Sequence, residues 1–164
     1  MRPLRSGDVV VADTTVFLDF LSRAGLGRSS PEASLNLLDE IERCCARFGC
    51  SEHLTDQWLS ARRDVQRGPL NGAALQLLAR LRDREKLFVK ARSASRCDVD
   101  SSEYQALPPE DRFLFDAASG AKAHFIVTTD PRIPLGVHHV PQHGGGKLEV
   151  EIVGPSELIA RMER

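Results

Sequence analysis

The feature that most constrains the fold is a repeated alternation between short apolar runs and longer segments with helical spacing. Apolar runs occur at 8–13 (DVVVAD) and 124–129 (HFIVTT), and shorter ones at 48–51 and 87–91. Runs of this length are typical of strands covered on both faces. Because helical patterns separate them, we expect a three-layer α/β fold with a central, mostly parallel sheet.

The segments between these runs carry helix signals. Ser30 suits a helix N-cap and Pro31 the first helical position, and the apolar stripe after them repeats at helical spacing. The segment 93–109 is polar and predicts a loop, whereas the alternating residues 148–153 predict a half-exposed edge strand. Helices are predicted over 15–25, 30–48, 52–65, 68–86, 110–123 and 155–164.

Composition limits the functional classes. The chain has 164 residues and a formal net charge of −1, which predicts one domain over 1–164 and no global attraction to nucleic acid or membrane. Neither a signal-peptide pattern nor a membrane-spanning run is present, so we expect a cytoplasmic protein. The four cysteines are expected to be reduced and partly buried. Three histidines lie near the GGGK segment, namely His138, His139 and His143. They are expected in an exposed loop.

Acidic residues follow two of the predicted strands. Asp13 ends the first apolar run and Asp130 follows the HFIVTT run, whereas Asp111 opens the helix before that run. Sites in open α/β sheets form at the carboxyl ends of the strands. Together with Asp56, in the helix after the FGCS run, these carboxylates are expected to converge on one edge of the sheet. Their mutual repulsion is costly without a divalent cation, so convergence predicts a metal site.

Each acid also has a structural explanation that needs no metal. Asp13 precedes two threonines and suits a helix N-cap, and Asp111 complements the helix dipole as a first-turn acid. The Asp130-Pro131 pair is a common turn initiator, and Asp56 suits a solvated helical face. A functional site is favoured only by the coincidence of all four at one end of the sheet.

The arrangement resembles the PIN-domain family, which contains metal-dependent nucleases, including the VapC-like toxins of bacterial toxin–antitoxin pairs. The resemblance rests on VVVADTTVFLDFL, on SEHLTDQW and on DRFLFDAASGAKAHFIVTTD, and it covers roughly residues 8–133. It implies a Rossmann-like sheet, a Mg²⁺ or Mn²⁺ site and endoribonuclease activity that hydrolyses phosphodiester bonds of RNA.

The resemblance assigns metal-binding acids to three matching positions, which are Asp13, Asp111 and Asp130. Thr128 is then the hydroxyl that supports the last of them. The family usually has glutamate at the remaining acidic position, and here that position falls at Asp56 or Gln57, of which we favour Asp56. Asp116 is a further acid expected at the rim of the site.

An all-oxygen site suits hard cations, and two such ions would activate water and neutralise charge on the phosphate. Asp13 is the best candidate for a bridging ligand. Nearby cations are the candidates for phosphate contacts, namely Arg62, Arg63, Arg67 and Arg112. The resemblance also implies an RNA substrate, an antitoxin protein as partner if the chain is a toxin, and a homodimer.

Two other classes stay open. A PIN-like module whose metal site has decayed would bind RNA or a protein partner without cutting, and the ambiguity between Asp56 and Gln57 separates it from a nuclease. A receiver domain of the response-regulator type also places acids at strand ends. That class requires an acid pair near the first strand and a lysine after the last strands, and neither is clear in this sequence.

Overall fold

The fold is known from a computed structural model, which describes residues 3–5, 7–16, 31–44, 46–51, 79–80, 83–84, 87–90, 98, 100–142 and 145–162. Several predicted site residues lie outside the described residues, namely Asp56, Gln57, Arg62, Arg63, Arg67 and His143. The predicted helix over 52–65 also lies outside them, as do most of those over 15–25 and 68–86.

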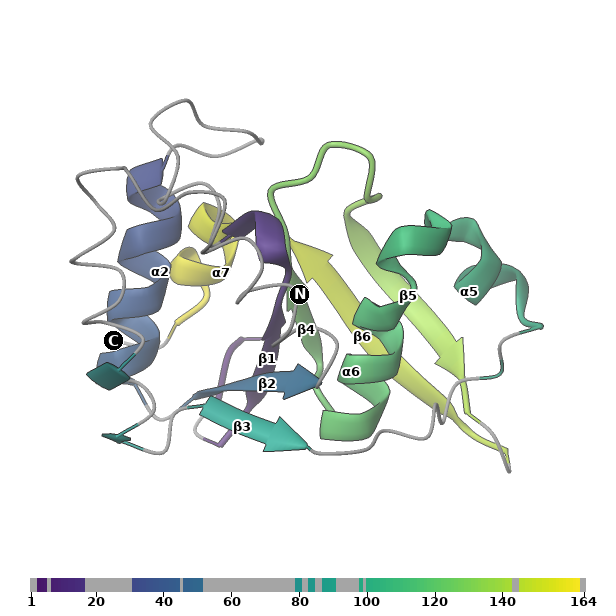
Figure 1. Ribbon diagram of the computed structural model, residues 1–164, viewed down its shortest axis with the longest axis horizontal. Coiled ribbons are helices and arrows are strands. Elements are labelled where there is room, and N and C mark those ends of the chain that lie inside the picture. The colour runs from purple at the N-terminus through teal and green to yellow at the C-terminus, as the bar shows by residue number, and fades with distance from the viewer. Residues whose placement is uncertain are drawn as a thin grey trace.

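A single sheet organises the described part of the chain. Its six strands are β1 (Val9–Ala12), β2 (Arg47–Ser51), β3 (Leu87–Lys90), β4 (Phe125–Val127), β5 (Gly136–Pro141) and β6 (Lys147–Val153). They lie in the order β3-β2-β1-β4-β6-β5, as Figure 1 shows, and the pairings are parallel except between β5 and β6. This confirms the predicted α/β class, the mostly parallel sheet and the four strands expected from apolar runs.

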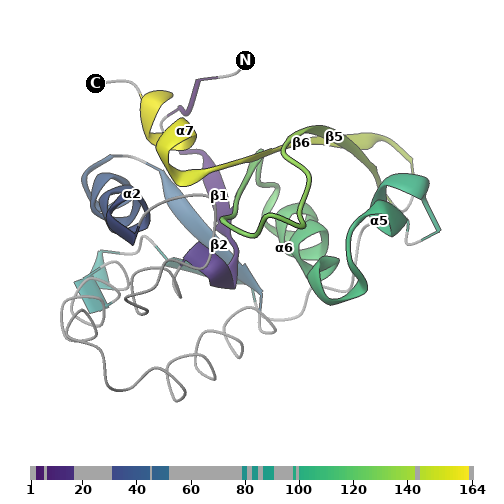
Figure 2. The same ribbon diagram turned by 90° about the horizontal axis from the view of Figure 1, so that it is seen from above.

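Helices cover both faces of the sheet. They are α2 (Pro31–Arg43), α5 (Ser102–Ala106), the 3₁₀ helix η1 (Pro109–Asp111), α6 (Phe113–Ala121) and α7 (Pro155–Ala160). Figure 2 shows α2 and α7 on one side of the sheet and α6 on the other. Among the helices in the described ranges, none combines the length and apolarity needed to cross a bilayer.

The side chains of β1 point alternately to the two faces of the sheet, and each face carries its own cluster of buried apolar residues. Val10 packs in a buried cluster with Leu38 of α2, and the next residue, Val11, packs in a second cluster with Leu114 of α6. Successive side chains of a strand point to opposite faces, so an unbroken apolar run is the pattern that a doubly covered strand requires.

The α6 helix lies unusually close to β2. A Cβ atom added at Gly49 would lie 2.9 Å from the Cβ of Ala121, at the C-terminal end of α6, and 2.7 Å from Cγ1 of Val9. Glycine therefore permits this contact. Lys122 then ends α6 in a left-handed conformation with φ 54°, and its N–H group bonds the carbonyls of Ala118 and Ser119.

The predicted loop over 93–109 is wrong in part, because α5 lies within it. Ser101 caps this helix, with its hydroxyl oxygen accepting a hydrogen bond from the Tyr104 N–H at 3.2 Å. Tyr104 is buried in the second core cluster together with Leu107. A polar segment with only two anchoring apolar residues does not show helical periodicity, and tertiary burial stabilises the short helix instead.

Two predictions for the C-terminal third are also wrong. The 148–153 segment is in β6, which is not an edge strand, because it pairs with β4 on one side and β5 on the other. Its alternation reflects partial exposure of one face rather than a missing neighbour. His138 and His139 lie on the edge strand β5 and not in a loop, because pairing with β6 satisfies their backbone.

Candidate functional site

The acids predicted from the sequence lie where the strand order reverses. From β1 the chain proceeds to β2 and β3 on one side, then crosses to β4 on the other side of β1. The carboxyl ends of β1 and β4 therefore flank a topological switch point, which is the usual ligand site of open α/β sheets. Asp13 directly follows β1, and Thr128, Thr129 and Asp130 directly follow β4.

Hydroxyl groups hold the Asp13 carboxylate. Its Oδ2 atom accepts hydrogen bonds from the hydroxyls of Thr15 and Thr128, both at 2.7 Å, and the residue is buried. Burial raises the pKa of the Asp13 carboxyl; the hydroxyls and the Thr14 N–H oppose that effect, and the nearby charge of Asp130 adds to it. Neutral donors orient this carboxylate without cancelling its charge.

The same threonines join the two strand ends. Thr15 Oγ1 lies 3.4 Å from Thr128 Oγ1 and accepts a hydrogen bond from the Thr129 N–H at 3.2 Å. Thr128 Oγ1 in turn accepts a hydrogen bond from the Asp130 N–H at 3.0 Å. Thr128, expected to support Asp130, therefore contacts its backbone while donating to the carboxylate of Asp13.

Asp111 reaches the same edge from η1, at the start of the α6 layer. Its Oδ2 atom is buried and has no hydrogen-bond partner, although the Arg132 Nη2 atom lies 3.8 Å away. Burial, and then the charge of Asp13, raise the pKa of Asp111 to about 6. Asp130 and Glu110 add to that rise and Arg132 opposes it. A buried carboxylate oxygen without a donor is destabilising, so this atom would gain from a proton or a cation.

Asp130 is held by an arginine that the sequence reasoning missed. Arg132 Nε lies 3.1 Å from each carboxylate oxygen of Asp130, and Nη2 lies 2.7 Å from Oδ2. The Arg132 N–H also donates to Asp130 Oδ1 at 2.8 Å, which is the side-chain turn expected of Asp-Pro. Nη1 of the same guanidinium donates to Glu110 at 2.8 Å. The sequence signal for this contact is the spacing of Asp130 and Arg132, because an arginine two residues after an aspartate in a turn can reach its carboxylate.

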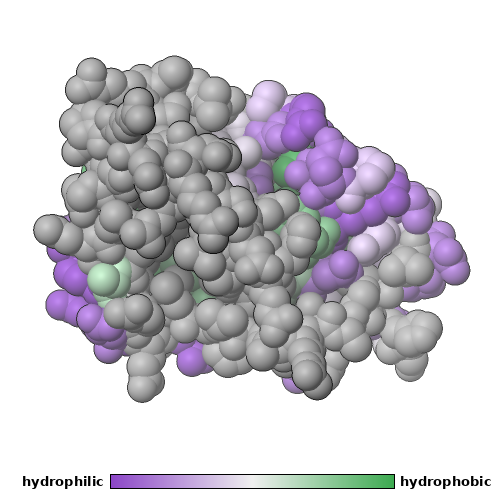
Figure 3. Space-filling view, viewed as in Figure 1, coloured by the Kyte–Doolittle hydropathy of each residue, from purple (hydrophilic) through white to green (hydrophobic). Residues whose placement is uncertain are grey.

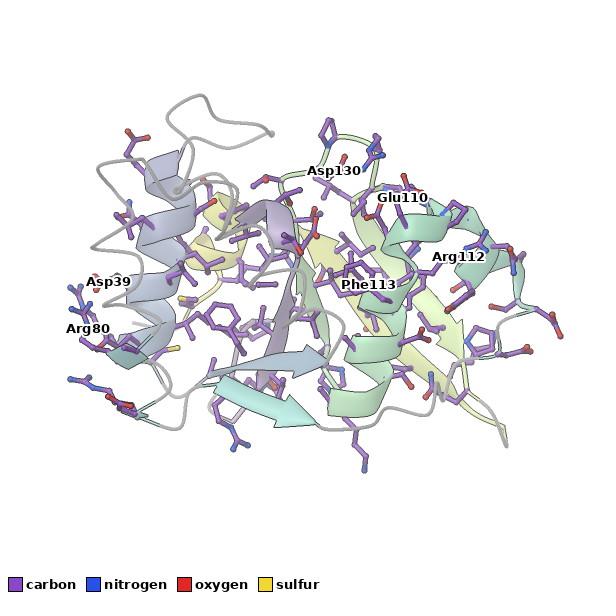
Figure 4. The ribbon with its side chains drawn as sticks, viewed as in Figure 1. Asp39, Arg80, Glu110, Arg112, Phe113 and Asp130 are labelled. Atoms are coloured by element: carbon purple, nitrogen blue, oxygen red, sulfur yellow. The ribbon has the colours of Figure 1, made fainter. Side chains whose placement is uncertain are left out.

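We call Asp13, Asp111 and Asp130 the acid cluster. The charge of Asp130 acts on Asp13, and those of Asp13 and Asp130 act on Asp111, so three separated segments converge at one edge of the sheet. Figure 4 shows Asp130 and Glu110 at this edge. The coloured surface over η1 and α5 in Figure 3 is predominantly hydrophilic. Two buried hydroxyl-bearing residues, Thr128 and Thr129, complete the surroundings.

The other residues predicted for the site either make contacts away from the acid cluster or lie outside the residues that the structure describes. Asp116, expected at the rim, accepts a hydrogen bond from the Tyr104 hydroxyl at 3.0 Å, which ties it to α5. Arg112 donates to the carbonyls of Leu107 and Gln105 at the end of α5. Asp56 lies outside the described residues. Cys44 is half-buried and forms no disulfide, which agrees with the prediction for this cysteine.

The donor set of the acid cluster is compatible with a hard divalent cation. It consists of carboxylates and hydroxyls, and one buried carboxylate oxygen has no hydrogen-bond donor. Within the described ranges, however, no three His, Cys, Asp or Glu side chains are close enough together to hold one ion. Both Asp130 carboxylate oxygens accept hydrogen bonds from the Arg132 guanidinium, so cation binding at Asp130 requires that guanidinium to move.

The chain was compared with protein families, curated proteins and solved structures. No protein-family model, no curated protein and no solved structure matches this chain. The PIN-domain resemblance stays a prediction drawn from the residues themselves.

Proposed function

We propose that this chain is a metal-dependent endoribonuclease of the PIN-domain type, acting in the cytoplasm. The observation that carries the proposal is the acid cluster at the switch point between β1 and β4. Three carboxylates from separate segments are buried there, and the pKa of two of them is raised. Purely structural caps and turns do not need to lie near one another, whereas the acids of a cation site do. In the described ranges the three carboxylates are not arranged to hold one ion together, so the proposal requires Arg132 to leave Asp130 when the ion binds.

The proposed roles follow from the contacts. Asp13, Asp111 and Asp130 would hold Mg²⁺ or Mn²⁺, with Asp56 as the further acid implied by the resemblance. Such ions supply an activated water and neutralise charge on the scissile phosphate. Thr15 and Thr128 orient the Asp13 carboxylate through their hydrogen bonds. The partners in this proposal are an RNA substrate, an antitoxin if the chain is a toxin, and a second copy of the chain.

The test is cleavage of single-stranded RNA by the purified protein with Mn²⁺ or Mg²⁺, and its loss when the ions are chelated. Asp13→Asn should abolish cleavage. The matched control is Asp39→Asn, because Asp39 is an aspartate on α2 that pairs only with exposed Arg43 among the contacts described. Cleavage that survives Asp13→Asn, or that persists without divalent ions, would refute the proposal.

A second candidate function is favoured by one specific observation, the fork that Arg132 forms on Asp130. In a degenerate PIN-like module, the guanidinium would replace the metal permanently, and the chain would bind RNA or a protein without cutting. Binding of labelled RNA that is unchanged by Mn²⁺, with no cleavage products, would favour this candidate over the nuclease.

A further inference from the structure

Arg132 bridges several carboxylates at the acid cluster. Its guanidinium contacts Asp130 through Nε and Nη2, Glu110 through Nη1 at 2.8 Å, and lies 3.8 Å from Asp111 Oδ2. The planar guanidinium matches a carboxylate in this two-bond geometry better than any other side chain. One cation therefore partly neutralises three acids.

The arginine itself is accessible, whereas its main partner is not. The Arg132 side chain is 58% exposed and that of Glu110 57%, whereas the Asp130 side chain is 8% exposed. Arg132 can therefore leave towards solvent without disturbing the core. Asp130 is placed by its position after β4 and by its N–H bond to Thr128, so it would remain in place.

The fork leaves one part of the cluster unneutralised. Asp111 Oδ2 is buried and accepts no hydrogen bond, and Arg132 stands beyond hydrogen-bonding distance of it. Arg132 makes most of its side-chain hydrogen bonds to the buried Asp130 and one to the exposed Glu110, and it leaves the buried Asp111 oxygen without a donor. The guanidinium therefore neutralises the cluster incompletely.

We propose that Arg132 is a displaceable internal counter-cation, which occupies the acid cluster when no metal is bound and competes with the divalent ion for Asp130. This rests on the proposed metal site. Binding of the ion then moves the guanidinium off Asp130 towards solvent and Glu110. Arg132 thereby lowers metal affinity and sets the cation concentration at which the site fills.

The test measures Mn²⁺ affinity by calorimetry on the full chain, with no activity readout. Arg132→Gln should bind Mn²⁺ at least about tenfold more tightly than the unchanged protein. The matched control is Arg43→Gln, which removes an arginine of similar exposure (66%) that pairs with Asp39 and Glu40 on α2. Its Mn²⁺ affinity should stay within about twofold.

A second variant separates competition for Asp130 from simple charge repulsion. Arg132→Lys keeps the positive charge but cannot form the two-bond fork, so it should bind Mn²⁺ several-fold more tightly. Repulsion alone predicts no change. Nitrogen-15 NMR gives an independent readout, because Mg²⁺ should shift the Arg132 Nε–H resonance of the unchanged protein and leave that of Arg43 in place.

The outcomes are distinguishable. If Arg132→Gln and Arg132→Lys bind Mn²⁺ no more tightly than the unchanged protein, the counter-cation role is refuted and the metal site stands. If no protein in the series binds Mn²⁺, the proposed metal site fails and this inference falls with it. If Arg132→Gln binds Mn²⁺ more tightly but Arg132→Lys does not, competition for Asp130 is also refuted. Charge repulsion between Arg132 and the ion would then explain the effect.

Discussion

Removing the charge of Asp111 should stabilise the protein, in contrast to most substitutions of buried residues. The folded pKa of Asp111 is about 6 against 3.8 for the free side chain, and each unit corresponds to about 1.4 kcal/mol. The shift therefore sets an upper limit of about 3 kcal/mol on the cost of the buried charge at neutral pH. Because the site can relax around the charge and Arg132 offsets part of it, we expect Asp111→Asn to raise the free energy of unfolding by less than this limit, about 1–2 kcal/mol.

The stabilisation expected from Asp111→Asn should increase with pH. A carboxyl whose pKa is raised by folding contributes stability below its unfolded pKa, and that contribution is lost as pH rises through the folded value. The difference between Asp111→Asn and the unchanged protein should thus be near zero below about pH 3, grow as pH rises towards about 6, and reach its full value above about pH 7.

Urea unfolding at several pH values, with chelator present, measures this difference. The control is Asp39→Asn, which breaks an ion pair on the surface of α2 and should change stability by less than about 0.5 kcal/mol at any pH. The reasoning is refuted if Asp111→Asn is less stable than the unchanged protein at neutral pH, or if its gain is independent of pH.

Three further predictions concern the site and the fold. Asp13→Asn should abolish RNA cleavage while leaving the thermal midpoint unchanged or raised, because burial and Asp130 disfavour the charge at Asp13; a helix-capping role predicts intact cleavage and a loss of at most about 1 kcal/mol. Gly49→Ala should destabilise by about 1–3 kcal/mol in urea unfolding, since the new Cβ would meet Ala121 at 2.9 Å; an unchanged midpoint would contradict the close packing. Lys122→Gly should raise the free energy of unfolding by up to about 1 kcal/mol, because φ is 54° there, and a lowered free energy of unfolding would contradict this.

The sequence was informative wherever a signal is local. The unbroken apolar runs of β1 and β4 predicted strands covered on both faces, and Pro31 predicted the first residue of α2. Alternation of strands and helices then predicted a parallel sheet, in which residues after neighbouring strands must share an edge. That geometry predicted Asp13 and Asp130 at the same edge of the sheet, and the pairing of β1 with β4 in the structure then made their strand ends neighbours.

Long-range packing decided the rest. Residues 102–106 form a helix that Ser101 caps and that the burial of Tyr104 beside residues of α6 stabilises. The cap is a local signal, whereas the burial of Tyr104 is not predicted by the sequence of 93–109. The 148–153 strand lies inside the sheet because β5 pairs with its outer side, and alternation is the same for an edge strand and for an inner strand with one exposed face.

The chemistry of the acid cluster depended most on tertiary structure. Sequence alone established which carboxylates follow which strands, because strand ends are local features. It did not establish that Asp111 is buried with an oxygen lacking a donor, or that Arg132 forms a fork on Asp130. Desolvation and charge interactions depend on distances between segments that are separated in the sequence, such as those of Asp13 and Asp130. Those distances are set only when the sheet and its two buried clusters have formed.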